Sequence, residues 1–510
     1  MKFQKLKSSA AALIAVTLIC KLIGMLRDVV LANYYGTTAV SDAYLIAVSV
    51  PTLIFYFVGH SISTAYLPMY NQVKKNKGKG SALDYTNNLT CIALLIVAVL
   101  VAALLVFTAP ILKLFAPGFD APTMALTVRF VRVSAASLLF MTLVSVWTGY
   151  LQANQNFIIP GSVSFVRNVV IILSIVLAAR FGLIYLGIGL LLAYVAECLL
   201  LLPFAWRAQY RPKLRIHLKE DEVKQTLYLI LPILLGVCVS QVNKVVDRSI
   251  ASSMLTGGVS ALSYASVLNT AIQEVLVTGI ITILFAHCAQ LVAQGEHQKV
   301  KAKLSSTIDA LILILLPAAA GVIILAEEVV TNILCRGNFD AASVQLTTGA
   351  LRCYSCGIIF LAIRDTLVKL FYAYKDTKTT TVTSIIAIAL NIGLNLLLSR
   401  FWGIDGLAAA TSIAAAAQCI VLYILLHKKI GDYGTKSTLI VLLKSAAAAG
   451  AMAGLLALLK YSQAFSSMPA LLSLLLMVLI GVAIYFAAAF LLRIRPLTDL
   501  LVGIRKKIKK

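Results

Sequence analysis

The sequence predicts an all-α polytopic membrane protein, and three observations support this fold class. Hydrophobic residues make up 60% of the 510 residues and charged residues only 13%, and the mean hydropathy is +0.94. Apolar stretches of about 20 residues recur between short polar breaks, which is the helical length that crosses a bilayer core. The strict apolar and polar alternation that a membrane barrel needs is absent.

The stretches predict about fourteen transmembrane helices, several of them long enough to tilt. The first is expected to be a retained helix and no signal peptide, because Lys21, Arg27 and Asp28 interrupt its apolar run. The second has the weakest pattern, since it contains Pro51 and His60. In chain order the expected spans are 8–33, 41–69, 86–112, 123–151, 158–179, 183–206, 224–252, 260–291, 304–330, 343–372, 379–399, 404–427, 437–459 and 467–492.

Lysine and arginine concentrate in alternate loops, beginning with the N-terminal segment. Cytoplasmic loops are enriched in these residues, so the pattern predicts that both termini are cytoplasmic. The net charge of +24 is then mostly a consequence of topology, and it needs no nucleic-acid partner. The opposite side is expected to hold only Lys113, Arg180, Arg336, Arg400 and Lys460.

Two pairs of similar segments predict an internal repeat. The segment LANYYGTTAVS, 31–41, is similar to IASSMLTGGVS, 250–260, and the segment 180–198 is similar to 400–419 with one insertion. Each pair relates a helix to the sixth helix after it. Because six is an even number of crossings, the two related helices run in the same direction through the membrane. We therefore expect two parallel six-helix lobes around a central cavity. The expected domains are 1–215 (N-lobe, helices one to six), 216–430 (C-lobe, helices seven to twelve) and 431–510 (two further helices and a basic tail).

Basic side chains also lie inside the apolar spans. A bare cation at the centre of a membrane helix costs about 2.5 to 3.5 kcal/mol on insertion scales, so such groups usually face a watery cavity or a partner. These residues are Lys21, Arg27, Arg129, Arg132, Arg167, Lys244, Arg248, Arg352, Arg364, Lys369 and Lys444.

The densest internal charge lies in spans one and seven. Lys244 and Arg248 are four residues apart and share a helix face, and Asp247 can pair with either. In span one, Asp28 lies two turns after a lysine, whereas Arg27 is expected to point about 120° away. Two interpretations stay open: salt bridges between helices, or a cationic cavity that receives an anionic headgroup.

Several segments resemble the MurJ (MviN) family of lipid II flippases, in the multidrug/oligosaccharidyl-lipid/polysaccharide exporter superfamily. The resemblance covers nearly the whole chain and is carried by KLIGMLRDVVLANYYGTTAVSDAYLIAVSVP (21–51), LQANQNFIIPGSVSFVRNVVII (151–172), RGNFDAASVQLTTGAL (336–351), FYAYKDTKTTTVTSIIAIALNIGLNLLL (371–398) and GIDGLAAATSIAAA (403–416).

The resemblance implies a fourteen-helix flippase in a bacterial cytoplasmic membrane. Such a protein moves undecaprenyl-pyrophosphate-linked GlcNAc-MurNAc-pentapeptide to the outer leaflet by alternating access, for peptidoglycan synthesis. The headgroup would enter a cationic cavity between the lobes, and the lipid tail would follow a groove at helices thirteen and fourteen. The implied partners are this lipid, the bilayer and cell-wall synthases, and a monomer is expected.

Individual positions match and depart from the family pattern. Arg27 and Asp28 match the Arg-Asp pair of helix one, and Asp42 matches the aspartate that opens helix two. Lys21 stands where a second arginine is usual, which keeps the charge but loses the bidentate fork. The family charges of helices two and eight fall at the uncharged or weakly basic Phe55, His60, Ser266 and Val267.

Two expected cations are missing, and two explanations stay open. Either cations on other helices replace them, or the substrate is another polyprenyl-linked glycan, such as a capsule, exopolysaccharide or teichoic-type precursor. The candidate substrate-binding cations are Lys21, Arg27, Lys244, Arg248, Arg352 and Arg364. The candidate ion-coupling or salt-bridge acids are Asp28, Asp42, Asp247 and Glu274, and the candidate hinges are Pro51 and Pro232.

Other function classes fit less well. A drug/cation antiporter needs acidic cavity residues, and the basic positions inside the spans argue against it. An enzyme needs clustered carboxylates or histidines, and the five histidines are scattered. No GxxxxGK[ST] loop for ATP occurs. We therefore expect no catalysis, no cofactor and no metal, with transport driven by a coupling ion or by the membrane potential, worth about 2.3 kcal/mol per charge per 100 mV.

Overall fold

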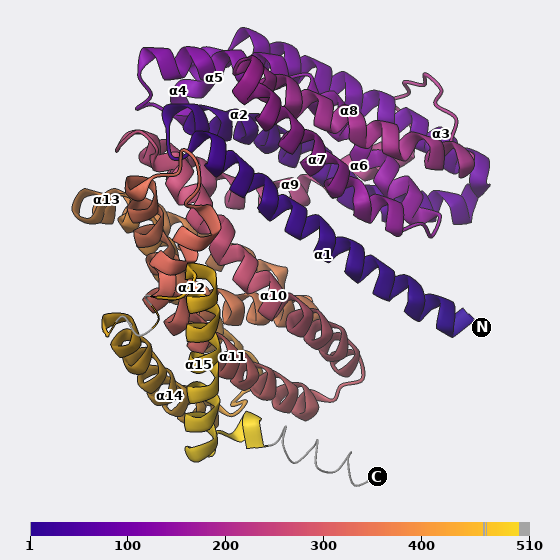
Figure 1. The fold of residues 1–510 in the computed structure, drawn as a ribbon. Coiled ribbons are helices and arrows are strands. Elements are labelled where there is room, and N and C mark those ends of the chain that lie inside the picture. Colours follow the sequence, from indigo (N-terminus) through magenta and orange to yellow (C-terminus); the bar gives the residue numbers. More distant parts are fainter. Residues whose placement is uncertain (1, 463–464, 466, 499–510) are drawn as a thin grey trace. The chain divides into compact units, whose positions relative to one another are not determined.

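The computed structural model describes residues 2–462, 465 and 467–498, and these residues form helices without a strand. Side chains are described except at residues 2–12, 14, 231–233 and 235–240. The chain divides into two compact units: Met1–Ser260 with Arg336–Phe339, and Ala261–Cys335 with Asp340–Lys510 (Figure 1). The two units are defined by the contacts within each of them. The lobes expected from the repeat, 1–215 and 216–430, have other bounds and stay a prediction.

The first unit consists of a long N-terminal helix, α1, and a bundle formed by the elements that follow it (Figure 1). Helix α1 packs mainly against α7 of this bundle. Its elements are α1 (Lys2–Tyr35), α2 (Ala39–Phe55), the π-helix η1 (Tyr56–His60), α3 (Ser61–Val106), α4 (Thr108–Phe115), α5 (Ala121–Ser134), α6 (Ser137–Ala153), α7 (Ile158–Phe181), α8 (Ile184–Arg207) and α9 (Asp221–Ser252).

The second unit is a helical bundle in which α11 packs against α12, α14 and α15, and α12 packs against α13. Its helices are α10 (Gly258–Ala293), α11 (His297–Leu334), α12 (Ala341–Ala373), α13 (Thr377–Ile430), α14 (Thr435–Tyr461) and α15 (Ala470–Leu491). Aspartates at the loop ends start two of them: Asp340 accepts from the Ser343 amide at 2.8 Å, and Asp376 accepts from the Thr379 amide at 3.1 Å.

Two glycines divide helices that are too long for one crossing. Gly78 in α3 has φ 85° and Gly403 in α13 has φ 58°, a left-handed region that favours glycine. At the first break the chain folds back on itself: Tyr66, before the break, stacks on Tyr85, after it, with ring centroids 6.0 Å apart. At the second, Asn391 Nδ2 donates to Thr411 Oγ1 at 3.3 Å.

Within the described residues, nine helices are long and apolar enough to cross a membrane, or ten when α5 and α6 count as one bent span. Gly78 divides the candidate span Ala39–Val106 and Gly403 divides α13, so each of these two segments is long enough for two crossings. The chain is a multi-pass membrane protein, and its helix count is approximately consistent with the predicted fourteen spans.

Two predicted spans differ from the helices found. The third, 86–112, is interrupted at Phe107, where α3 ends and α4 begins. The fourth, 123–151, is broken between α5 and α6, which meet at 44°. Here the amides of Leu138 and Leu139 bond to carbonyls three residues back, each at 3.2 Å, so a tighter turn bends the span.

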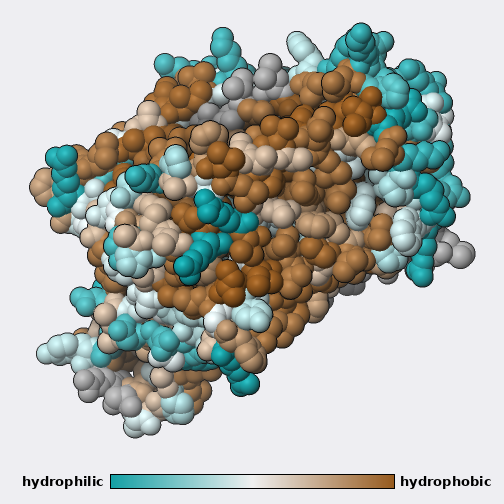
Figure 2. Space-filling model, turned by 90° about the horizontal axis from the view of Figure 1, so that it is seen from above, coloured by the Kyte–Doolittle hydropathy of each residue, from teal (hydrophilic) through white to brown (hydrophobic). Residues whose placement is uncertain are grey.

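The cores of the two units differ in composition. In the first unit, tyrosine rings pack on one another: the centroids of Tyr70 and Tyr150 lie 5.8 Å apart in a T-shaped arrangement, and those of Tyr150 and Tyr210 lie 5.3 Å apart in a tilted one. In the second unit, the buried cluster is mainly aliphatic and contains residues from each of the helices α10 through α15. Large hydrophobic side chains also cover much of the outer surface, as brown areas in Figure 2 show for one face. A lipid-facing surface explains this exposure.

A short segment from the loop before α12 belongs to the first unit. The Asn338 amide donates to the Asn33 carbonyl at 2.9 Å, and the Asn338 side chain donates to the Tyr34 carbonyl at 2.6 Å. Gly337 is required there, since a Cβ would lie 2.3 Å from the Asn33 oxygen. The end of α1 therefore holds this loop through backbone contacts.

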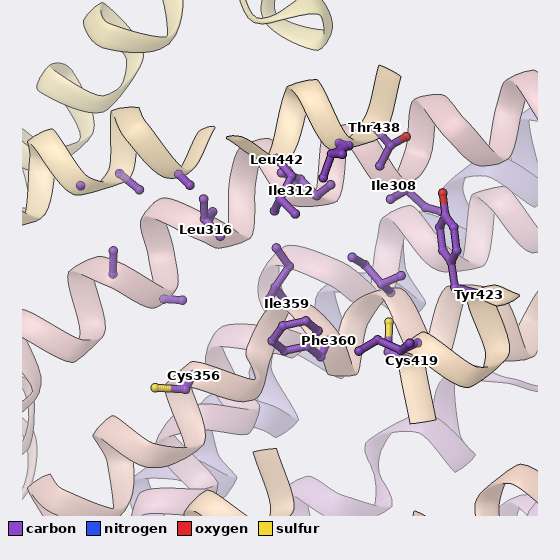
Figure 3. A pocket seen from close by; sticks show the side chains of 18 of the residues that line it. Ile308, Ile312, Leu316, Cys356, Ile359, Phe360, Cys419, Tyr423, Thr438 and Leu442 are labelled. Atoms are coloured by element: carbon purple, nitrogen blue, oxygen red, sulfur yellow. The ribbon is translucent and has the colours of Figure 1, made fainter. Parts of the chain in front are cut away.

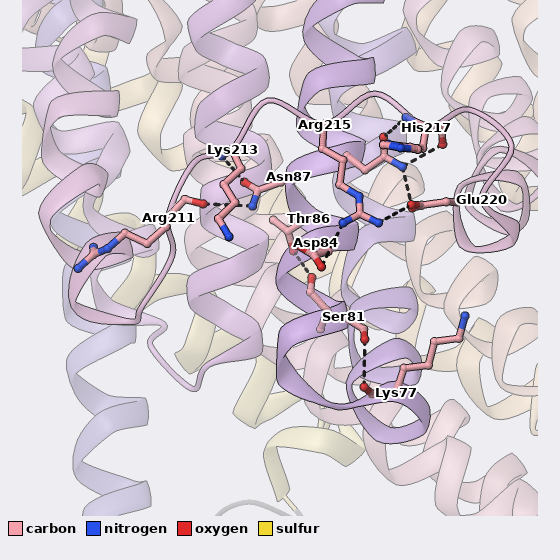
Figure 4. A network of polar contacts seen from close by, with 12 residues as sticks. Lys77, Ser81, Asp84, Thr86, Asn87, Arg211, Lys213, Arg215, His217 and Glu220 are labelled. Atoms are coloured by element: carbon pink, nitrogen blue, oxygen red, sulfur yellow. Dashed lines mark hydrogen bonds and ion pairs between the residues drawn. The ribbon is translucent and has the colours of Figure 1, made fainter.

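Two neighbouring asparagines of α3 fix the loop between α8 and α9 (Figure 4). Asn87 Nδ2 donates to the Arg211 carbonyl at 3.1 Å, and Asn88 Nδ2 donates to the His217 carbonyl at 2.9 Å and to Glu220 at 2.7 Å. Arg215 joins Glu220 at 2.8 Å. The loop backbone thus bonds to side chains in place of a secondary-structure partner.

Candidate substrate-binding site

A small polar cavity lies inside the first unit, among its membrane-spanning helices. Its volume is about 80 Å³, the space of two or three water molecules at about 30 Å³ each. Helices α1, α2, α6, α7 and α8 contribute to it, together with the end of α5. The polar residues of the lining are Arg27, Asp28, Tyr44, Thr52, Ser134, Ser137, Arg167 and Tyr194.

Arg27 forms a two-pronged ion pair with its neighbour Asp28. Its Nε and Nη2 both donate to Asp28 Oδ1, at 3.0 and 2.7 Å, and its Nη1 donates to Asn168 Oδ1 at 3.2 Å. Arg27 is expected to point about 120° away on the helix, and its long stem nevertheless brings the guanidinium round to the acid. The Asp28 side chain is 11% exposed and that of Arg27 31%, so the cation is the more accessible partner.

A second ion pair reaches the same cavity, and sequence reasoning missed it. Arg167 Nη1 lies 3.2 Å from Glu197 Oε1, and the guanidinium lies 5.6 Å from the Tyr194 ring centroid. The signal was available, since Arg167 interrupts the fifth apolar span and Glu197 the sixth. What the sequence did not give is that these two positions meet.

Asp42 has a structural role in this unit. Its Oδ2 accepts from the Gly257 amide and its Oδ1 accepts from the Ser260 amide, both at 2.7 Å. Because the first amides of a helix lack partners within it, this carboxylate caps the start of α10 from a distant part of the chain. Asp42 is only 2% exposed.

The other candidates of the first unit are more peripheral to this cavity. Lys21 is exposed on α1, and Lys244 is exposed on α9, whereas Asp247 and Arg248 on α9 are half-buried. None of these four residues lines the cavity described above. Their assignment to a substrate site stays a prediction.

The second unit holds the remaining candidates. Arg352 on α12 is exposed and its Nε donates to the Ile323 carbonyl at 3.3 Å. Arg364 forms an ion pair with Asp365 at 2.7 Å. Glu274 is exposed on α10. Arg364 therefore already has an acidic neighbour, and the assignment of these three residues to a substrate or coupling site stays a prediction.

The predicted hinge Pro51 is buried in α2, and the helix continues past it to Phe55. The irregular backbone follows directly, as the π-helix η1, a feature that is frequent at functional sites. Gly59 is needed in it because a Cβ would lie 2.1 Å from the Phe55 ring. The side chain of Pro232, the other predicted hinge, lies outside the described residues.

Two apolar grooves lie in the second unit. One, of about 400 Å³, lies between α11, α14 and α15 and includes Gly321, Met452, Gly481 and Tyr485. The other, of about 600 Å³, is lined by α11, α12, α13 and α14, with Ile312, Phe360 and Leu442 pointing into it (Figure 3). Both present hydrocarbon side chains of the kind that contact a lipid tail.

Comparison with solved structures supports the fold. One, described as "Lipid II flippase MurJ, inward closed conformation", aligns with a TM-score of 0.80 at 23% identity, covering 96% of this chain and 99% of its own. A multidrug resistance MATE family transporter of the MOP superfamily, in an inward-facing conformation, aligns with a TM-score of 0.67 at 14% identity over 84% of this chain and 99% of its own.

Sequence relatives point to the same family. A protein of Bdellovibrio bacteriovorus described as "Probable lipid II flippase MurJ" is 26% identical over 451 residues, which cover 87% of this chain and 85% of the relative. A protein of Thermotoga maritima with the same description is 24% identical over 499 residues, 95% of this chain and 96% of the relative. The family model "Lipid II flippase MurJ" matches residues 31–485. The chain therefore belongs to the MurJ family of lipid II flippases.

Proposed function

We propose that this protein moves lipid II, the undecaprenyl-pyrophosphate-linked peptidoglycan precursor, from the inner to the outer leaflet of the cytoplasmic membrane. The observation that carries the proposal is the polar cavity of the first unit, in a chain that matches the MurJ family model over residues 31–485. Arg27 provides a cation there whose acidic partner is less exposed than the cation itself. A diphosphate is the anionic part of this substrate.

The second unit supplies surfaces for the lipid tail. The groove between α11, α14 and α15 is lined almost wholly by hydrocarbon, with a volume of about 400 Å³. A polyprenyl chain gains about 0.8 kcal/mol for each CH₂ group that leaves water, so it stays in apolar surroundings throughout transport. We propose that the tail follows this groove while the headgroup crosses.

The driving force comes from outside the chain. The headgroup carries net negative charge, and its movement outward is favoured by an inside-negative potential. This gain is about 2.3 kcal/mol per charge for each 100 mV. With Asp42 bonded to backbone amides and Asp28 to Arg27, we propose the potential as driving force and place ion coupling second. The basic loops place both termini in the cytoplasm in this proposal.

Uncharged residues at positions where the family has charges favour a second candidate substrate class. Phe55, Ser266 and Val267 stand where the family pattern has charges, so the headgroup site has fewer cations than expected. A flippase for a capsule, exopolysaccharide or teichoic-type precursor linked to the same polyprenyl diphosphate would share the tail groove and Arg27. The two candidates differ in the part of the headgroup beyond the diphosphate.

Complementation separates them. The gene is expressed in a bacterium depleted of its lipid II flippase, and the precursor that accumulates on the inner leaflet is measured. We expect restored growth and loss of the accumulated precursor. No rescue there, together with rescue of a capsule or exopolysaccharide flippase mutant, would establish the second substrate class.

A further inference from the structure

Arg167 of α7 faces the same cavity as Arg27, although it lies on another helix. Nη1 of Arg167 lies 3.2 Å from Glu197, and its Nη2 donates to Ser164 Oγ at 3.1 Å. The ring of Tyr194 lies 5.6 Å from the guanidinium carbon. Three side chains thus fix the position of this cation.

The exposure of the two partners is unequal. The Arg167 side chain is 30% exposed, whereas that of Glu197 is 1% exposed. The Arg27 pair has the same asymmetry, with 31% for the cation and 11% for the acid. In both pairs the carboxylate is less exposed than the guanidinium. Both cations border the same cavity; Asp28 lines it as well, whereas Glu197 is not part of the lining.

The guanidinium group is suited to a phosphate in this arrangement. It has five N–H donors in a planar fork, and it binds phosphate oxygens in a bidentate manner. Among the described residues, the polar contacts of Arg167 use Nη1 and Nη2, which leaves donors for a ligand. Tyr194 lines the same cavity as both arginines.

We infer that Arg167 is a second substrate-binding residue, which together with Arg27 holds one phosphoryl group of the lipid diphosphate in this cavity. The inference rests on the proposed function and adds to it a residue and a ligand group. The cavity is small, at about 80 Å³, and its two guanidiniums suit one compact anionic group. Glu197 is then a positioning residue that keeps Arg167 at the cavity wall.

Binding of undecaprenyl pyrophosphate to the purified full-length chain in nanodiscs tests this inference. We expect Arg167→Gln to raise the Kd about tenfold or more, the loss of one charge-assisted bidentate contact. Glu197→Gln should lower the Kd, because the glutamine oxygen can still accept from Arg167 and hold it in position, while the competing carboxylate charge is removed. Arg180→Gln, the same change near the end of the same helix, is the matched control and should leave the Kd unchanged.

A purely structural ion pair gives a different pattern. Both Arg167→Gln and Glu197→Gln would then lower the melting temperature, and the folded fraction of each would bind like the wild type, which would overturn the inference. Arg167→Lys keeps a charge without the fork and should bind with intermediate affinity, so it serves where Arg167→Gln does not fold. An Arg167→Lys Kd equal to that of the wild type would overturn the inference as well.

The same preparation separates this inference from the proposed function. Lipid II translocation by the wild type is measured in parallel. A wild type that translocates lipid II but binds the diphosphate independently of Arg167 refutes the inference alone. A wild type that binds the diphosphate through Arg167 but does not translocate lipid II supports the inference and refutes lipid II as the substrate.

Discussion

Two arginine-aspartate pairs, one in each unit, have the same geometry but different surroundings. Arg27 contacts Asp28 through Nε at 3.0 Å and Nη2 at 2.7 Å, and Arg364 contacts Asp365 through the same atoms at the same distances. The Asp28 side chain is 11% exposed and that of Asp365 is 49% exposed. Arg27 also bonds to Asn168 and borders a cavity. Pairing distances therefore do not distinguish the two arginines, whereas burial of the acidic partner and a cavity beside the cation do.

The largest expected difference between the two pairs is in transport. Arg27→Ala should abolish complementation of a flippase-depleted bacterium, because it removes a cation from the cavity, while Arg364→Ala should still support growth. Membrane insertion of both variants is checked by their abundance in the membrane fraction. Normal growth with Arg27→Ala would remove this residue from the site, and loss of growth with Arg364→Ala alone would reverse the comparison.

The acidic partners should differ in their effect on stability. Asp28→Ala leaves a partly buried guanidinium without its carboxylate, and we expect the free energy of unfolding to fall by about 3 kcal/mol. Asp365→Ala breaks a more exposed pair and should cost less than about 1 kcal/mol. Unfolding of the purified variants in detergent measures both values. Equal losses would show that burial of the acid does not distinguish the pairs.

Asp42 can be compared with these two aspartates, because it accepts its hydrogen bonds from backbone amides and they accept theirs from arginines. Asp42→Ala removes two bonds of 2.7 Å to backbone amides that then stay buried, and should cost about 2 kcal/mol. The matched control is Asp120→Ala, which removes a single exposed cap with a bond of 3.3 Å to Thr123 and should cost less. A larger loss for Asp120→Ala would contradict the capping role of Asp42.

The smallest effects concern the loops, where an acid of each unit has a lowered pKa. Burial raises the pKa of Glu220, but the hydrogen bonds from Arg215 and Asn88 outweigh it and hold the pKa below its usual value. For Asp376, the bond from Lys429 lowers the pKa. Each acid therefore stabilises the fold above the pKa of the unfolded chain, and this contribution is lost as the pH falls through the lower folded pKa.

The pH dependence can be checked with Glu220→Gln and Asp376→Asn. The difference in melting temperature between each variant and the wild type should be largest above about pH 5 and should close as the pH falls below about 4. A difference that stays constant from neutral to acidic pH would show that the carboxylate charge is not what stabilises the loop.

The sequence predicted the membrane fold well because long apolar runs have one stable solution in a bilayer. The same runs did not reveal the π-helix at 56–60 or the bend between α5 and α6, since both depend on backbone bonds that side-chain hydropathy does not encode. The breaks at Gly78 and Gly403 were visible in the sequence as short polar segments between spans.

The site was predicted less completely. The cation in the first apolar helix drew attention to Arg27, which lines a cavity inside the first unit together with Asp28, but its role in substrate binding stays a prediction. The partner of Arg167 is thirty residues away on α8, and the amides that Asp42 caps lie beyond residue 256, so neither contact follows from helix periodicity. Contacts between separate helices require the packing, which one sequence does not provide.

Translocation of lipid II by the purified chain in proteoliposomes tests the central claim most directly. An enzyme that modifies only outward-exposed headgroups measures how much lipid II crosses the bilayer. We expect the wild-type chain to raise the crossing rate well above that of protein-free vesicles, and Arg27→Ala to return it to that background. A wild-type rate equal to that of protein-free vesicles, or an unchanged rate with Arg27→Ala, would contradict the account.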